Sequence, residues 1–122
     1  MRRILVVDDS ELMQSLMKYA LGRLKDFEVS FARNGKEALD LITSTGEPSL
    51  ILLDINMPVM DGFGLLRRLT TLGMTQRVPV IIVSTEGCEA DVLRGLEAGA
   101  RAYLPKPFKA QDLHTMIERV LS

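Results

Sequence analysis

Residues 4–10 read ILVVDDS, a short apolar run that ends in two carboxylates. Three later runs have the same form, since each consists of a few apolar residues followed by a polar group. They are Leu50–Leu53 before Asp54, Val80–Val83 before Ser84-Thr85, and Ala102–Leu104 before Pro105-Lys106. Continuous apolar runs of this length are typical of strands that are covered on both faces, as in a parallel sheet. Because parallel strands end at the same edge, the sequence predicts that these polar groups gather in one place.

Helical patterns separate the runs, with apolar residues three and four positions apart. Ser10 is a good N-cap for the first helix, Asn34-Gly35 opens the second, and Gly99 is a good C-terminal cap for the fourth. The five expected helices cover about residues 12–24, 35–42, 63–69, 92–96 and 113–121. The five expected strands cover residues 4–7, 27–31, 50–53, 80–83 and 101–104.

The character of each strand predicts its place in the sheet. The strand at 27–31 alternates apolar and polar residues, and the strand at 101–104 is short and begins with Arg101, so these two belong at the edges. The expected fold is α/β, a doubly wound (βα)5 three-layer sandwich of the flavodoxin-like kind, with a five-stranded parallel sheet in the order 2-1-3-4-5. That order places a crevice between the first and third strands, where Asp8, Asp9 and Asp54 lie.

Composition limits the class of protein. A chain of 122 residues with 47% hydrophobic residues predicts one domain over residues 1–122. A net charge of −1 is unlike that of most nucleic-acid-binding domains. No segment approaches the roughly 20 apolar residues that a membrane span needs. The single cysteine, Cys88, cannot form an internal disulfide, so we expect a cytoplasmic protein with neither a nucleic-acid nor a membrane partner.

The polar groups at the predicted edge have a recognisable chemistry. Asp8, Asp9 and Asp54 would repel one another at short distance unless a positive charge compensates them. Magnesium is the natural compensation, because it prefers oxygen ligands and retains coordination positions for a phosphoryl oxygen. The set therefore predicts a Mg²⁺ site at which Asp54 accepts a phosphoryl group.

Four blocks of sequence resemble the receiver domain of bacterial two-component response regulators, the stand-alone chemotaxis regulators included. The resemblance runs nearly from end to end, and the blocks occur in the family's order and spacing. They are Leu5–Ser10, Leu53–Pro58 with Met60-Asp61-Gly62, Pro79–Ser84, and Gly99-Ala100 followed by Tyr103–Phe108. One departure is that Thr85 stands where many receivers have alanine.

The resemblance implies a role for each residue of the acidic site. Asp9 and Asp54 would bind Mg²⁺ directly, Asp8 through water, and Asn56 through its backbone carbonyl. Lys106 would pair with the phosphoryl group on Asp54. The family pattern also implies a cis peptide bond between Lys106 and Pro107.

The resemblance also implies a switch. Ser84 would move to hydrogen-bond the phosphoryl group, and the ring of Tyr103 would fill the vacated space. Asn56 and Glu86 occupy positions that tune hydrolysis of the acyl phosphate in the family. His114, on the last predicted helix, is expected to be an ordinary surface residue rather than a phosphohistidine.

The implied partners are a sensor histidine kinase as phosphodonor and an output protein that binds a face at about residues 86–121. The protein would be a monomer or a weak phosphorylation-dependent dimer in chemotaxis or motility. It would catalyse only its own phosphorylation and dephosphorylation.

Three alternatives remain open: a receiver cut from a larger regulator, a receiver that serves only as a scaffold, and an aspartate-nucleophile phosphatase of the haloacid dehalogenase type. The phosphatase signature places a second carboxylate two residues after the nucleophile, where this chain has Asn56.

Overall fold

The computed structural model describes residues 2–54, 62–85 and 89–122, in which strands and helices alternate along the chain. The strands are β1 (Arg2–Val7), β2 (Phe27–Ala32), β3 (Leu50–Asp54), β4 (Val80–Thr85) and β5 (Ala102–Lys106). The helices are α1 (Glu11–Leu21), α2 (Gly35–Thr45), α3 (Gly62–Thr71), α4 (Glu89–Glu97) and α5 (Ala110–Leu121), with a short 3₁₀ helix, η1 (Met74–Gln76), between α3 and β4.

All five strands are parallel and lie in the order β2-β1-β3-β4-β5, which confirms the predicted fold and both predicted edges. The register matters most at the carboxyl ends of the strands. Val7 of β1 is paired with Leu53 of β3, so the residues that follow them in the chain, Asp8 and Asp54, lie side by side. Thr85 at the end of β4 is paired with Lys106 at the end of β5. The sheet therefore brings the polar ends of four strands, β1, β3, β4 and β5, to one edge.

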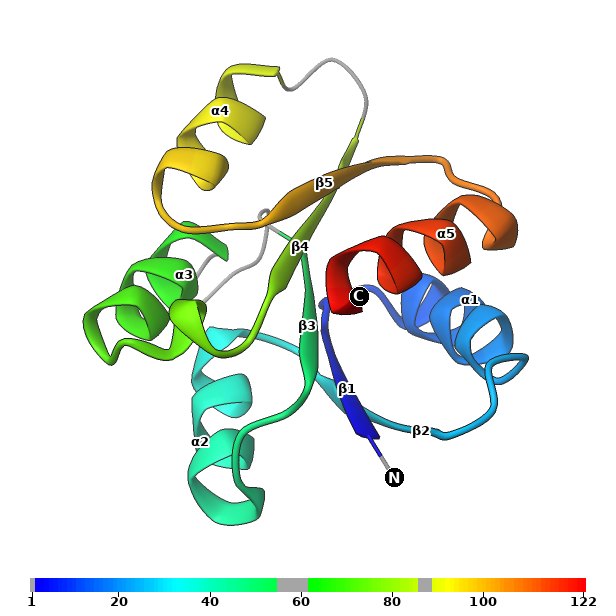
Figure 1. Ribbon diagram of the computed structural model, residues 1–122, viewed down its shortest axis with the longest axis horizontal. Helices are drawn as coiled ribbons and strands as arrows, with labels where there is room; N and C mark the ends of the chain where they lie inside the picture. Colours follow the sequence, from blue (N-terminus) through cyan, green and yellow to red (C-terminus); the bar gives the residue numbers. More distant parts are fainter. Residues whose placement is uncertain (1, 55–61, 86–88) are drawn as a thin grey trace.

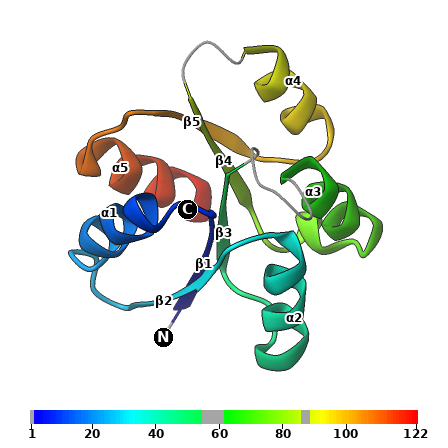
Figure 2. The same ribbon diagram turned by 180° about the vertical axis from the view of Figure 1, so that it is seen from behind.

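Helices cover both faces of the sheet (Figures 1 and 2). α1 and α5 lie together on one face and enclose a core that includes Ile4, Leu52 and Ile81. α2 and α3 lie on the other face, together with α4, above a core that includes Leu5, Leu53 and Leu66. Alternate residues of the central strands thus enter opposite cores, which is why those strands read as unbroken apolar runs.

The predicted helix caps are confirmed. The side-chain oxygen of Ser10 accepts a hydrogen bond from the Met13 amide at 3.2 Å, and that of Asn34 accepts one from the Glu37 amide at 2.9 Å. Gly99 has a φ of 121°, a conformation that favours glycine, two residues after α4 ends. No helix in the described ranges is long and apolar enough to cross a membrane.

Most of the predicted helix and strand boundaries are wrong by one to three residues, and two of these differences have a clear local cause. The first helix ends at Leu21 instead of continuing to Leu24, because the chain turns there and the Leu24 amide donates to the Leu21 carbonyl at 3.0 Å. Leu24 still packs against the core, so its apolar character resembled one more helical turn. The last strand runs through Lys106 rather than ending at residue 104, because β4 is long enough to pair with Pro105 and Lys106.

Candidate functional site

Three carboxylates meet at the carboxyl ends of β1 and β3. Asp8 and Asp54 are buried, with 2% and 7% of their surface exposed, whereas Asp9 is exposed. One carboxylate oxygen from each of the three residues lies within 4.8 Å of the others. The structure therefore brings together three of the predicted site residues.

Asp8 is held on several sides. Its backbone amide donates to the Ala32 carbonyl of β2 at 3.0 Å, which continues the sheet by one residue. Its carboxylate Oδ1 accepts a hydrogen bond from the Ser10 amide at 2.9 Å, and its Oδ2 accepts one from Lys106 Nζ at 3.3 Å. Burial of a carboxylate is costly unless it is paired and hydrogen-bonded, and Asp8 meets both conditions.

Lys106 supplies a positive charge to the cluster. Its Nζ lies 3.3 Å from Asp8 Oδ2 and 3.8 Å from Asp54 Oδ2, so one ammonium faces both buried carboxylates. The peptide bond between Lys106 and Pro107 is cis, as expected. The ammonium reaches the site from β5, two strands away from Asp54, which the pairing of β4 with β5 makes possible.

The donor set fits a hard divalent cation. Three carboxylates against one ammonium leave an excess of negative charge at this point, which a cation would compensate. Two oxygens bound to one Mg²⁺ at about 2.1 Å are at most about 4.2 Å apart. Oxygens that lie within 4.8 Å of one another can reach that geometry through a small side-chain adjustment or one bridging water. A water-bridged carboxylate is the arrangement that the family resemblance implies for Asp8.

The remaining predicted residues have different outcomes. Ser84 lies in β4, where its backbone pairs with Pro105 of β5. Tyr103 in β5 is partly buried and packs against the core beneath α2 and α3. Asn56 and Glu86 lie outside the described residues.

Sequence reasoning missed two polar contacts. The Gln14 side-chain amide donates to the backbone carbonyl of Asp8 at 2.7 Å. Gln14 lies four residues after the N-cap Ser10, and residues so spaced share a helix face, which is the signal that could have revealed it. His114, expected at the surface, is partly buried, and its Nε2 donates to the Ala20 carbonyl at 2.8 Å.

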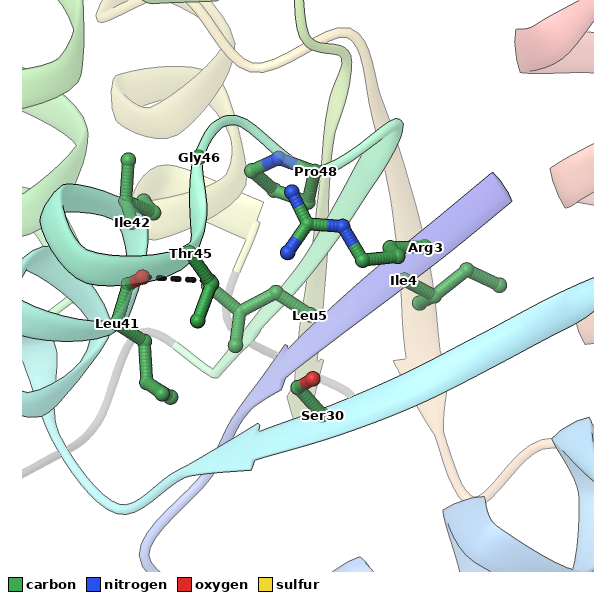
Figure 3. Close-up of a pocket in the computed structure, with 9 residues that line it drawn as sticks. All are labelled: Arg3, Ile4, Leu5, Ser30, Leu41, Ile42, Thr45, Gly46 and Pro48. Atoms are coloured by element: carbon green, nitrogen blue, oxygen red, sulfur yellow. Dashed lines mark hydrogen bonds between the residues drawn. The ribbon is translucent and has the colours of Figure 1, made fainter. Parts of the chain in front are cut away.

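A small pocket lies at the opposite edge of the sheet (Figure 3). Its lining comes from the start of β1, the end of α2 and the turn before β3, and includes Arg3, Thr45 and Pro48. Its cavity volume of about 10 Å³ is close to the least that can hold one water molecule. We therefore assign the functional site to the acidic edge.

Comparisons with known proteins agree with this geometry. A family model described as the response regulator receiver domain matches residues 4–118. A chemotaxis protein CheY homolog of Campylobacter jejuni is 39% identical over 119 residues, which are 98% of this chain and 92% of that protein. The transcriptional regulatory protein CpxR of Escherichia coli is 40% identical over 121 residues, which are 99% of this chain but only 50% of that protein.

Solved structures give the same result. A putative response regulator from Chloroflexus aurantiacus superposes with a TM-score of 0.91 at 30% identity, over 98% of this chain and 97% of that one. The chemotaxis protein CheY4 of Vibrio cholerae superposes with a TM-score of 0.89 at 30% identity, over 99% of both chains. The sequence match, the strand order and the acidic edge agree, and the chain belongs to the family of response regulator receiver domains, which are signalling domains of two-component systems.

Proposed function

We propose that this chain is a phosphorylation-switched receiver that accepts a phosphoryl group on Asp54 in a Mg²⁺-dependent reaction. The observation that carries the proposal is the placement of one buried carboxylate, Asp54, close to two further carboxylates and the ammonium of Lys106. Asp54 is the acceptor because it ends the central strand β3, in the position that the family resemblance gives to the phosphoacceptor.

The transfer requires little covalent chemistry from the protein. The P–N bond of a donor phosphohistidine breaks and its electron pair stays on the imidazole nitrogen, while an Asp54 oxygen forms the new P–O bond. Charge spreads over the phosphoryl oxygens during transfer, and the Lys106 ammonium, 3.8 Å from Asp54 Oδ2, stabilises it. Asp8, Asp9 and Asp54 would hold Mg²⁺, with the Asn56 carbonyl as a further ligand, and the bound ion would neutralise phosphoryl charge.

The phosphoryl group would be sensed through β4 and β5. Ser84 would hydrogen-bond the new phosphoryl oxygens, and Tyr103 would move into the space that Ser84 leaves. The proposal is supported by the pairing of these strands up to Thr85 and Lys106, and by the partial burial of Tyr103. The output face would comprise α4, β5 and α5, where Leu93 of α4 is 62% exposed. Glu86 and Asn56 would set the lifetime of the acyl phosphate.

A phosphodonor protein would approach the acidic edge beside α1. Leu12, Leu16 and Tyr19 on α1 are 70%, 50% and 72% exposed, although large apolar side chains are usually covered. Leu16 and Tyr19 border a groove of about 290 Å³ that also includes Pro107, next to Lys106 in the chain. A sensor histidine kinase that presents its phosphohistidine to Asp54 would cover this surface, whereas a small donor such as acetyl phosphate would not.

The difference between donors can be measured. Leu16→Lys should leave labelling by acetyl phosphate unchanged. It should slow labelling by those members of a panel of phosphorylated histidine kinases that label the wild type. Equal slowing with both donors would argue against a donor surface on α1.

The acceptor itself is tested by incubating the protein with Mg²⁺ and acetyl phosphate and measuring the intact mass. The wild type should gain one phosphoryl group, and Asp54→Asn should gain none. Asp40→Asn, which changes an exposed aspartate on α2, is the matched control and should label like the wild type. Labelling of Asp54→Asn at the wild-type rate would refute the assignment.

Two settings remain for the receiver. Similarity to chemotaxis proteins over nearly their whole length supports a regulator of chemotaxis or motility. Similarity to CpxR, of which the match covers 50%, supports a receiver that controls an attached domain. We favour the first setting, and an interaction screen of the protein with and without beryllofluoride would distinguish them by the partner that binds only the treated form.

A further inference from the structure

We propose that Gln14 is a positioning residue for the Mg²⁺ site, acting through the peptide that joins Asp8 to Asp9. This inference rests on the proposed function of the acidic edge. Gln14 lies in the first half of α1 and its side chain contacts none of the three carboxylate groups in the described contacts. Its influence on a bound ion would therefore be indirect.

The contact joins a helix side chain to the backbone of the site. Gln14 Nε2 lies 2.7 Å from the carbonyl oxygen of Asp8, which is a short hydrogen bond for this pair of atoms. Asp8 is the first residue beyond β1, so its amide is bonded to β2 while its carbonyl points beyond the regular ladder. Gln14 supplies the donor that the strand no longer provides.

The position of Gln14 is itself fixed. Its backbone amide donates to the Ser10 carbonyl at 2.9 Å, and the Ser10 side chain caps α1 through the Met13 amide. The Ser10 amide in turn donates to Asp8 Oδ1 at 2.9 Å. Two hydrogen bonds therefore fix Asp8 at the start of this turn. Gln14 donates one to its carbonyl oxygen, and the Ser10 amide donates the other to its carboxylate.

The consequence falls on Asp9. The Asp8 carbonyl and the Asp9 amide belong to one planar peptide unit, so fixing the carbonyl oxygen fixes the direction in which the chain enters Asp9. Asp9 is exposed, whereas Asp8 and Asp54 are buried, so packing constrains its side chain least. Its carboxylate depends on the backbone for its place in the cluster, and Gln14 holds that backbone.

Mg²⁺ affinity tests the inference without any phosphoryl transfer. Gln14→Met has nearly the same shape and cannot donate a hydrogen bond, and Gln14→Leu is a second variant of the same kind. Ser15→Ala changes the next, exposed residue of α1 and is the matched control. Each protein is titrated with MgCl₂ while its backbone amide signals are followed by NMR, and its melting temperature is measured without Mg²⁺. Partners that orient metal ligands typically contribute 10–100-fold in affinity, and we expect about tenfold weaker Mg²⁺ binding in both Gln14 variants.

The outcomes separate a positioning role from a merely structural one. Weaker Mg²⁺ binding in both Gln14 variants, with wild-type binding in Ser15→Ala, is the expected result. Lower melting temperatures with an unchanged Kd for Mg²⁺ would overturn the inference, because Gln14 would then stabilise the fold only. A wild type that binds no Mg²⁺ would overturn the proposed function and this inference with it. Wild-type binding that persists in both Gln14 variants overturns the inference alone.

Discussion

The distance between α4 and the sheet depends on Gly95. A Cβ atom at this position would lie 2.0 Å from Cδ1 of Ile82, which is far inside van der Waals contact. The next nearest atoms would be Ile82 Cγ1 at 3.5 Å and Phe63 Cε1 at 3.7 Å, which are ordinary contacts. Ile82 lies in β4 and is completely buried, so its side chain has little room to withdraw. The one severe overlap thus involves a single methyl group.

Two opposing effects determine the stability of Gly95→Ala. Alanine in a helix interior is favoured over glycine by about 1 kcal/mol, whereas overpacking a well-packed core costs about 1–3 kcal/mol. We therefore expect Gly95→Ala to destabilise the wild type by up to about 2 kcal/mol. Ile82→Val removes Cδ1 at a cost of about 1 kcal/mol. In that background Gly95→Ala meets only ordinary contacts, so it should stabilise the protein by about 1 kcal/mol.

The assay is urea unfolding followed by far-UV circular dichroism, applied to the wild type, both single variants and the double variant. Ile81→Val is the matched control, because Ile81 is equally buried but belongs to the core under α1 and α5. The effects of Gly95→Ala and Ile81→Val should add. If Gly95→Ala stabilises the wild type as much as it stabilises Ile82→Val, α4 does not approach β4 as closely as described.

Three further predictions concern charge and capping. Without Mg²⁺, Lys106→Gln should lower the free energy of unfolding by about 2 kcal/mol, because it removes an ammonium from two buried carboxylates. Added Mg²⁺ should then raise the melting temperature of Lys106→Gln more than that of the wild type. An equal rise would contradict this. Hydrogen bonds from Arg77 hold the pKa of Glu47 below its ordinary value of 4.5, so this pair stabilises the fold above pH 4.5 and the contribution is lost as the pH falls further. When the pH is lowered from 6 to 3, the free energy of unfolding measured in urea should therefore fall less for Glu47→Gln than for the wild type. Asn34→Ala should cost about 1 kcal/mol in the same assay at neutral pH, because it removes the N-cap of α2, and an unchanged midpoint would contradict the cap.

The fold could be predicted because burial determines the pattern of each strand. Leu50–Leu53 enters both cores and reads as an unbroken apolar run, whereas β2 lies at an edge and alternates. The end of α1 could not be predicted in the same way. Leu24 packs against the same core as the helix but lies beyond its last turn, and a pattern of apolar residues reports burial without reporting backbone hydrogen bonds.

The candidate site, like the fold, could be predicted from the sequence only in part. Asp8 and Asp54 could be placed together because each ends a central parallel strand, and paired strands align their ends. The contact of Gln14 with the Asp8 carbonyl could not be predicted, because it depends on the path of the turn between β1 and α1. The pairing of Lys106 with Asp8 depends in a similar way on where β5 ends, one strand beyond β4. Strand ends are set by topology, whereas contacts across a turn are set by local geometry.

The charge balance of the site explains why a cation and a phosphoryl group should bind together. Asp8, Asp9, Asp54 and Lys106 sum to a formal charge of −2 when all are ionised, and Mg²⁺ brings this sum to zero. Phosphorylation of Asp54 would replace its single charge with a group of about −1.5 to −2, so the four groups with Mg²⁺ would carry about −0.5 to −1. Without Mg²⁺ the same modification would leave about −2.5 to −3 on these four groups, with the charge of Lys106 already included. Because coupling between two bound groups is reciprocal, a phosphoryl group that needs Mg²⁺ for its stability must also tighten the binding of Mg²⁺.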